Sequence, residues 1–206
     1  MIESIDNANT AQLRQWWQKL PADVPETEDM EKEDRERFLY DEVGSKLLEN
    51  DPEGLSFLTG FAESKNVSQR ASSLFFIANN CADKAATESL LVKAFHSNDL
   101  YLRGTALQGF IQTKIFPLKR NELETISDDW LAAWAMSYTS AAYPRNRITT
   151  LCSALKSKNP YMRAFACDII GDQFIEHLKP KLKPLLRDKN PMVADAAGYN
   201  YYELLE

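Results

Sequence analysis

Residues 158–171, with the sequence KNPYMRAFACDIIG, form the stretch that decides how this chain folds. Asn159 is of a residue type that caps the N-terminus of a helix, and Pro160 suits the first helical position. Apolar residues then follow at the spacing of one helix face. The stretch therefore predicts a tight turn that leads directly into a helix.

The same pattern recurs along the chain, which indicates internal repeats. One copy follows it at residues 189–197, and two copies precede it at residues 66–73 and 98–106. A further unit near residues 128–132 lacks both the Pro and the Arg, so its assignment rests on spacing and on a small residue in register.

The spacing of the repeats becomes visible when the register is fixed on one anchor position. The anchors are Arg70, Arg103, Ala132, Arg163 and Ala194, and neighbouring anchors are 29 to 33 residues apart. Three positions after each anchor stands a small residue: Ser73, Ala106, Ala135, Ala166 and Ala197. A period near 30 with two helices per unit is typical of an α-solenoid. Because closely crossing helices need small side chains at the crossing, we predict that these five residues are buried.

This arrangement resembles the HEAT-repeat family, whose second helix typically opens with an Asp/Asn-Pro turn, an aliphatic residue, an Arg and an Ala-rich run. The resemblance covers roughly residues 52–206. It implies an all-α fold, a right-handed α-solenoid of about five HEAT-like helix pairs. We expect residues 27–206 to form this repeat domain, and residues 1–26 to form an N-terminal capping helix and an acidic loop.

The hydrophobic periodicity predicts helices throughout the chain and no strands. The expected helices after residue 50 span residues 52–61, 67–80, 85–96, 100–112, 121–127, 129–142, 145–157, 160–176, 178–187 and 191–205. An earlier helix at residues 8–20 places Leu13, Trp16, Trp17 and Leu20 on one face. We expect this face to cover the first repeat, and the alternative is that the Trp pair anchors a partner.

Composition and cysteine usage favour a cytoplasmic protein. No apolar stretch is long enough for a membrane span, and the N-terminus has no basic region of the kind that begins a secretory signal. The three cysteines, Cys81, Cys152 and Cys167, are not closely spaced, so we expect no disulfide framework. Cys152 and Cys167 are interpreted as small buried hydrophobic residues, whereas Cys81 could be reactive.

The search for catalytic chemistry finds no nucleophile–base pair, and we expect no catalytic residue, cofactor or metal. His96 and His177 are the only histidines and lie far apart in the sequence. One enzymatic alternative is a HEAT-like DNA glycosylase. In that case the acid and aromatic side chains of that class would be imitated by Asp128, Asp129, Trp130 and Trp134. No glycosylase motif matches residue by residue.

The charges are distributed unevenly along the chain. Residues 21–37 carry eight acidic and three basic residues, whereas residues 145–189 carry ten basic and four acidic residues. The acidic segment 23–36 is either a solvated helix face or a docking site for a basic partner. The basic run at residues 179–189 could bind nucleic acid, and the alternative is that its lysines are simply solvated.

The repeat register predicts a binding surface, because second helices line the concave face of HEAT-like solenoids. One row on that face contains Tyr101, Trp130 and Tyr161, which would offer large rigid contacts to a protein partner. The alternative is that these aromatic residues pack between repeats. The candidate partner-binding residues are Tyr101, Trp130, Tyr161, Asp168, Asp172, Tyr199, Asp128 and Asp129.

Small size, net charge of −6 and the missing catalytic set together resemble small bacterial immunity or inhibitor proteins. We therefore expect a monomeric, cytoplasmic protein that neutralises a cognate basic toxin, with a nuclease as one candidate, by stoichiometric binding. A generic scaffold or assembly factor is the alternative within the binding class. A nucleic-acid-binding protein that uses the basic C-terminal half is the alternative outside it.

Overall fold

The computed structural model describes residues 5–20, 32–80 and 83–203, and within these ranges all regular secondary structure is helical. The all-α prediction is therefore confirmed for this part of the chain. The chain forms two compact units, residues 1–113 and residues 114–206. The domain boundary predicted at residue 26 lies outside the described residues.

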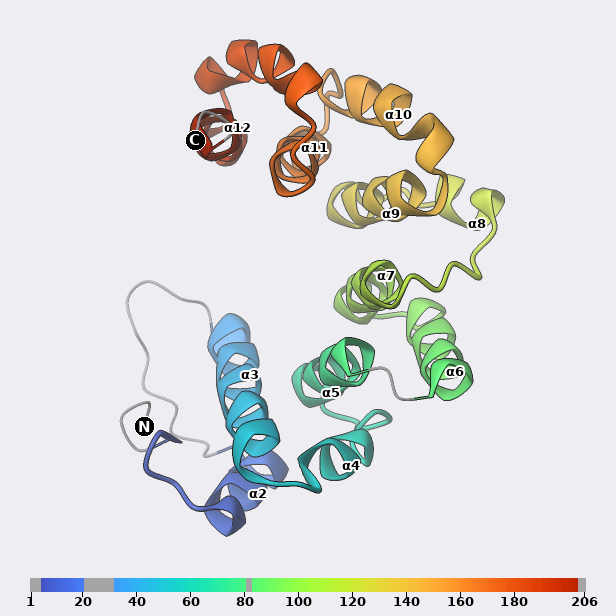
Figure 1. The fold of residues 1–206 in the computed structure, drawn as a ribbon. Coiled ribbons are helices and arrows are strands. Elements are labelled where there is room, and N and C mark those ends of the chain that lie inside the picture. The colour runs from blue at the N-terminus through green and yellow to red at the C-terminus, as the bar shows by residue number, and fades with distance from the viewer. Residues whose placement is uncertain (1–4, 21–31, 81–82, 204–206) are drawn as a thin grey trace. The chain divides into compact units, whose positions relative to one another are not determined.

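The first unit is built from six described helices (Figure 1). They are α2 (Thr10–Gln18), α3 (Lys32–Asn50), α4 (Gly54–Thr59), α5 (Val67–Asn79), α6 (Lys84–Phe95) and α7 (Leu100–Thr113). Helix α5 packs between α3 and α7, while α4 contacts α3 and α5, and α6 contacts α5 and α7. The three longer helices thus form one layer of this unit, and the two helices between them form a second.

Helix α2 is attached to the first unit by its aromatic face. Leu13 and Trp17 are fully buried, and the Trp17 ring meets the edge of Tyr40 with ring centroids 5.1 Å apart. Gln69 on α5 donates a hydrogen bond of 2.6 Å from Nε2 to the carbonyl oxygen of Trp17. Trp17 is therefore part of the core and cannot serve as an exposed partner anchor.

Gly44 lets α3 approach these aromatic residues closely. A Cβ atom at this position would overlap the ring of Phe76 and would lie 2.9 Å from the ring of Trp17. The close approach explains why the middle of a long helix contains a residue that costs about 0.5–1 kcal/mol relative to Ala.

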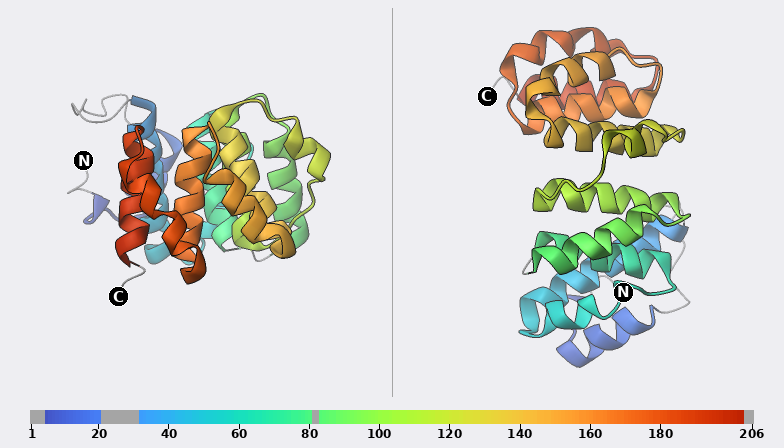
Figure 2. Two further views of the ribbon diagram at one scale, coloured as in Figure 1. Left: turned by 90° about the horizontal axis from the view of Figure 1, so that it is seen from above. Right: turned by 90° about the vertical axis from the view of Figure 1, so that its right-hand side faces the viewer.

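The described part of the second unit, residues 114–203, contains five α-helices and three short 3₁₀ segments. They are α8 (Arg120–Glu124), α9 (Asp129–Ala142), η1 (Pro144–Asn146), α10 (Arg147–Ala154), α11 (Pro160–Asp172), η2 (Glu176–Lys181), η3 (Lys183–Arg187) and α12 (Pro191–Glu203). Helix α11 packs between α9 and α12, and Figure 2 shows α11 and α12 running side by side. Helix α10 contacts α9 and α11, while η3 packs against α12.

Local capping explains why the helices begin where the sequence predicts. Asn159 accepts a hydrogen bond of 2.9 Å from the backbone N–H of Tyr161, and Pro160 occupies the first helical position. Asn66 likewise accepts from the N–H of Gln69 at 2.9 Å. These bonds satisfy backbone donors that have no partner inside the helix.

The prediction about small residues is also confirmed. Ser73, Ala106, Ala166 and Ala197 are fully buried, and Ala135 is 6% exposed. Each stands on a helix that packs against neighbours on more than one side. The register that was fixed on the anchor positions therefore identifies the inward face of these helices correctly.

The predicted helix at residues 178–187 is wrong. The segment forms the two 3₁₀ segments η2 and η3, because Pro180 and Pro184 remove backbone donors that an α-helix would need. The helix predicted at residues 160–176 ends at Asp172 instead. There Phe174 takes a left-handed conformation with φ of 48°, and the N–H of Ile175 donates to the carbonyl of Ile170 at 2.9 Å.

Both described cysteines have reduced thiols. Cys167 is fully buried and burial raises the pKa of its thiol to about 12, which confirms its interpretation as a small buried hydrophobic residue. Cys152 is half-buried and packs against the same core. Cys81 lies outside the described residues. No helix within the described ranges is long and apolar enough to span a membrane.

Candidate functional site

An exposed surface on α11 and α12 combines acidic and aromatic side chains. We call it the acidic–aromatic patch, and it consists of Asp168, Asp172, Asp195, Tyr199 and Tyr202. The helical spacing places Asp168 and Asp172 on one face of α11. Asp195, Tyr199 and Tyr202 follow the i, i+4, i+7 spacing and share one face of α12.

A buried asparagine joins the two halves of the patch. Asn200 is 2% exposed, and its Nδ2 donates one hydrogen bond to Asp168 Oδ1 at 2.9 Å and another to the carbonyl of Ala196 at 2.8 Å. Because Tyr199 is next to Asn200 in sequence, the Asp168 carboxylate lies near the level of Tyr199 along α12, and the side chains of Tyr199 and Asn200 point about 100° apart around the helix. The patch therefore comprises exposed residues of two packed helices that this hydrogen bond joins.

The electrostatics of the patch favour a cationic ligand. Burial of the Asp168 carboxyl against α12 raises its pKa, the hydrogen bond from Asn200 opposes this, and the nearby charge of Asp172 raises it further. The residue as a whole nevertheless counts as exposed, so its charge is accessible to a partner. Asp172 is the last residue of α11, where the helix dipole adds negative potential.

The tyrosines give the patch its apolar area. Tyr199 is 68% exposed and Tyr202 is 61% exposed, so most of each ring faces solvent. Single exposed apolar residues are common on protein surfaces, but two exposed rings one helical turn apart, on a helix pair that also carries three exposed aspartates, are a more specific feature. Tyrosine supplies rigid contact area and a polar hydroxyl, a combination that is enriched at protein interfaces.

The aromatic residues of the predicted row are less exposed than those of the patch. Tyr101 is half-buried, and the guanidinium of Arg37 lies 3.6 Å from its ring centroid. Trp130 and Tyr161 are also half-buried. The ring of Trp130 meets that of Trp134 at 6.3 Å, and Trp134 in turn meets Phe165 of α11 at 5.0 Å.

Tyr101 and the other members of this row lie in different units, so the row as a whole stays a prediction. Within the second unit, the aromatic contacts between α9 and α11 match the alternative in which such residues pack between repeats.

The two acids at the start of α9 have different surroundings. Asp128 caps the helix, because its Oδ1 accepts a hydrogen bond of 2.8 Å from the N–H of Leu131. Asp129 is exposed, and its carbonyl oxygen accepts from Asn159 Nδ2 at 2.7 Å. Asp128 therefore has a structural role in addition to any contact that it makes with a partner.

Two residues of the patch were not among the predicted site residues. Asp195 and Tyr202 lie one turn on either side of Tyr199, and that spacing in the sequence was the available signal. The acidic segment 23–36 is the competing surface, and residues 23–31 of it lie outside the described residues.

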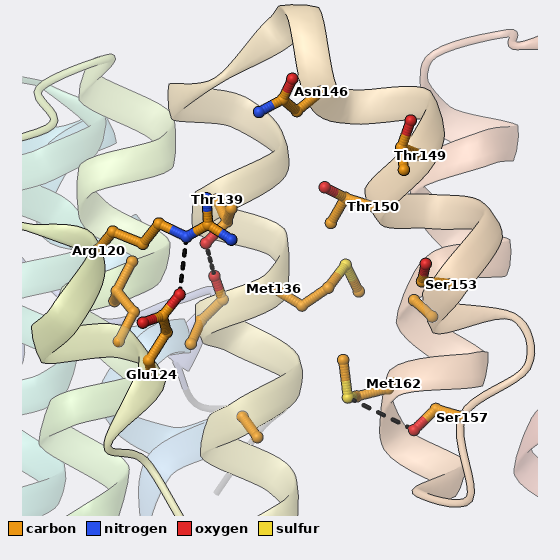
Figure 3. Close-up of a pocket in the computed structure, with 14 residues that line it drawn as sticks. Arg120, Glu124, Met136, Thr139, Asn146, Thr149, Thr150, Ser153, Ser157 and Met162 are labelled. Atoms are coloured by element: carbon orange, nitrogen blue, oxygen red, sulfur yellow. Dashed lines mark hydrogen bonds and ion pairs between the residues drawn. The ribbon is translucent and has the colours of Figure 1, made fainter.

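An open pocket of about 730 Å³ lies elsewhere in the second unit (Figure 3). Its base is formed by α9, through Ala132, Ala135 and Met136, and its sides are formed by α8 and α10. The pocket exists because α8 has only five residues and leaves the outer side of α9 partly uncovered.

Polar side chains surround this pocket without forming a catalytic arrangement. The hydroxyl-bearing residues that line it are Thr139, Thr149, Thr150, Ser153 and Ser157. The only charged residues along its walls are Arg120 and Glu124, which pair with each other at 2.7 Å. With no His or Cys among the lining residues, these hydroxyls have no partner that could activate them as nucleophiles.

The described part of the chain contains no cluster of three or more His, Cys, Asp and Glu residues suited to a metal ion. His96 and His177 are exposed and belong to different units. No protein-family model matches this sequence, and comparison with curated proteins finds no match either. The acidic–aromatic patch is therefore the feature of the described residues that bears most directly on function.

Proposed function

We propose that this chain is a HEAT-like helical-repeat protein that binds a basic protein partner stoichiometrically through the acidic–aromatic patch. One observation carries the proposal: Tyr199 and Tyr202 expose 68% and 61% of their surface, and three exposed aspartates lie on the same pair of packed helices, α11 and α12. Folding does not require this arrangement, because both rings lie largely outside the core.

The two kinds of side chain would contribute differently to binding. The tyrosine rings would enter apolar pockets of the partner, where a truncated aromatic anchor typically costs 2 kcal/mol or more, as an order-of-magnitude estimate. The carboxylates would attract basic residues and speed the encounter. Such a surface needs neither a cofactor nor a metal.

The repeat architecture is part of the same proposal. Five small residues that recur at a spacing of 29 to 33 residues are buried, which supports a right-handed solenoid of about five HEAT-like pairs. The capped turns before α5 and α11 support the family resemblance. Residues at equivalent positions of neighbouring second helices, such as Asp168 and Tyr199, would then form one binding face.

We propose further that the protein is a monomeric, cytoplasmic immunity or inhibitor protein and that its partner is a toxin domain. A nuclease toxin is expected to be basic, because it binds nucleic acid phosphates. An acidic surface with aromatic anchors complements such a domain. Inhibition by occupying that surface would require no chemistry from the inhibitor.

The test is a capture experiment followed by titration. The full chain and a Tyr199→Ala/Tyr202→Ala variant are used as baits, and a captured protein is purified and titrated by calorimetry. We expect a 1:1 complex, inhibition of the partner's activity, and a loss of affinity of at least about 30-fold in the double variant, the value for a single anchor of about 2 kcal/mol. Tyr143→Ala is the matched control, because Tyr143 is 39% exposed at the end of α9 and outside the patch.

The proposal fails if the double variant keeps its fold and binds the captured partner with the affinity of the parent chain. It also fails if the chain removes bases from alkylated DNA with multiple turnovers. The protein would then act as an enzyme and not as a stoichiometric inhibitor.

A further inference from the structure

A second charged surface lies on the short segments η2 and η3 and on the turn between η3 and α12. Figure 1 shows η2 and η3 as the orange-red turns over α12. We call this surface the basic ridge, and it consists of Lys181, Lys183, Arg187 and Lys189, all of which are exposed. It is separate from the acidic–aromatic patch, which lies on α11 and α12.

The ridge rests on a fixed support. Leu178 is 2% exposed and Leu182 is fully buried, so both side chains hold the segment to the core of the second unit. Leu185 and Leu186 pack against the same core. Pro180 and Pro184 further restrict the backbone. The backbone that carries the cations is thus anchored to the core, whereas lysines in a solvated tail would have no such anchor.

The one acid inside the ridge is already neutralised. Arg163 donates from Nε to Asp188 Oδ2 at 2.9 Å and from Nη2 to Asp188 Oδ1 at 2.8 Å. The two side chains are 9% and 10% exposed, and the Arg163 hydrogen bonds lower the pKa of Asp188. Asp188 therefore mainly offsets the charge of Arg163, and its remaining electrostatic interaction with Lys189 is the smallest of the causes that lower its pKa.

No carboxylate among the described residues forms an ion pair with any of the four ridge cations. Lys179, the remaining cation of the segment, lies 5.2 Å from the ring centroid of Tyr201 and is only partly exposed. Glu176, at the start of η2, is the nearest exposed acid in sequence. The ridge therefore presents a local excess of positive charge.

The negative net charge of the whole chain does not reflect the local positive charge of the ridge. The chain has a net charge of −6, but residues 114–206 contain 13 Lys and Arg against 11 Asp and Glu, a net charge of +2. The unit that carries the ridge is therefore slightly basic, and its acids lie largely on other segments. A polyanion that approaches the ridge meets a positive local potential.

We infer that the basic ridge binds the phosphate backbone of a nucleic acid. Three of its four cations are lysines, which are depleted at protein–protein interfaces because their strongly hydrated ammonium groups resist desolvation. Phosphate binding suits them, because lysines that neutralise phosphates release condensed counterions without being buried. No residue from 178 to 189 is aromatic, so the ridge itself offers no ring for base stacking and its binding is independent of base sequence.

This inference predicts how binding depends on salt. The logarithm of the binding constant falls by about 0.9 per neutralised phosphate for each unit of log salt on duplex DNA, and by about 0.7 on single strands. Four ridge cations therefore give slopes of about −3.6 and about −2.8, respectively. Affinity should fall by roughly two orders of magnitude on duplex DNA between about 50 mM and about 200 mM salt.

The test uses the full chain and fluorescently labelled single-stranded and double-stranded oligonucleotides, with anisotropy measured across this range of salt. Lys181→Gln/Lys183→Gln should weaken binding. It should also make the slope of the logarithm of the binding constant against log salt shallower by the contribution of about two neutralised phosphates. Lys65→Gln/Lys84→Gln removes two exposed lysines of the first unit and should leave both quantities unchanged. Tyr199→Ala should also have no effect, which separates this surface from the proposed protein-binding patch.

Three outcomes would overturn the inference. The first is that neither oligonucleotide binds at about 50 mM salt. The second is that the control pair weakens binding as much as the ridge pair does. The third is that polyglutamate competes as well as an oligonucleotide of equal charge, which would assign the ridge to acidic proteins. Melting temperatures of all variants exclude loss of fold as the cause.

Discussion

Gly171 on α11 lies directly against the side chain of Asn200 on α12, so closely that a Cβ atom at position 171 would overlap Asn200 Oδ1. The same Asn200 side chain bridges Asp168 and the carbonyl of Ala196. Because Gly171 has no side chain, α11 leaves room for the Asn200 amide of α12, and this amide joins the two helices that carry the acidic–aromatic patch.

Gly171→Ala should destabilise the protein even though alanine is the better helix former. The added methyl group forces Asn200 to move, and overpacking of this kind costs about 1–3 kcal/mol. Urea unfolding measures the loss. Gly198→Ala on α12 is the control, because no atom lies within 4 Å of a Cβ there, and it should be neutral or stabilising by up to about 1 kcal/mol. Equal effects of the two substitutions would contradict the close packing at Gly171.

Removing the Asp188 carboxylate should make the protein less stable at neutral pH. Asp188→Asn weakens two charge-assisted hydrogen bonds from Arg163, and such bonds contribute about 1–3 kcal/mol each. The partner is left nearly buried, since the Arg163 side chain is 9% exposed. Chemical unfolding at pH 7 compares the variant with the parent chain.

The same pair predicts a pH dependence with a definite sign. The pKa of Asp188 is lowered in the folded protein, so its contribution to stability is complete above the pKa of an unfolded Asp, about 3.9. It is lost as the pH falls through the folded value. The stability difference between the parent chain and Asp188→Asn should therefore shrink below about pH 4. A difference that stays constant down to pH 2 would argue against the ion pair.

Ala166→Leu tests the repeat register. Ala166 is fully buried on α11, so the larger side chain should cost about 1–3 kcal/mol and lower the melting temperature. Ala85→Leu on α6 is the control, because Ala85 is exposed and should tolerate the change. If both variants melt with the parent chain, position 166 cannot lie at a close helix contact.

Much of the fold could be predicted because its signals are local. Five helices start at the predicted residues, because caps and prolines act within a few residues. These starts are Val67, Leu100, Asp129, Pro160 and Pro191. The end of α11 could not be predicted. Phe174 adopts a left-handed backbone conformation, a position that Gly usually occupies at the end of a helix. Because a Phe stands there, the sequence at position 174 does not predict the helix end.

The candidate site could be predicted in part. Asp168, Asp172 and Tyr199 follow from the repeat register, which assigns a face to each helix. The sequence could not tell that Tyr101 lies under the guanidinium of Arg37, because that contact joins α3 to α7 across a long stretch of chain. Burial of this kind depends on tertiary packing, so residue type and spacing alone do not determine which aromatic residue stays exposed.

The last prediction concerns the kinetics of partner binding at the acidic–aromatic patch. Asp168→Asn/Asp172→Asn removes charges that act before contact, so it should lower the association rate constant and leave dissociation nearly unchanged. Tyr202→Ala removes contact area that forms only in the complex, so it should speed dissociation. Surface plasmon resonance with the captured partner separates the two rate constants, and melting temperatures verify that the Asn200 contact tolerates the change at position 168.

Salt provides the matched control for this pair. The effect of the Asp double variant should fade above about 0.15 M salt, where the Debye length falls below about 8 Å, whereas the effect of Tyr202→Ala should persist. Tyr101→Ala, in the first unit, tests the predicted aromatic row independently. Normal binding by the patch variants together with lost binding by Tyr101→Ala would move the interface from the α11–α12 surface to α7. Such a result would replace the patch while leaving stoichiometric binding as the mode of action.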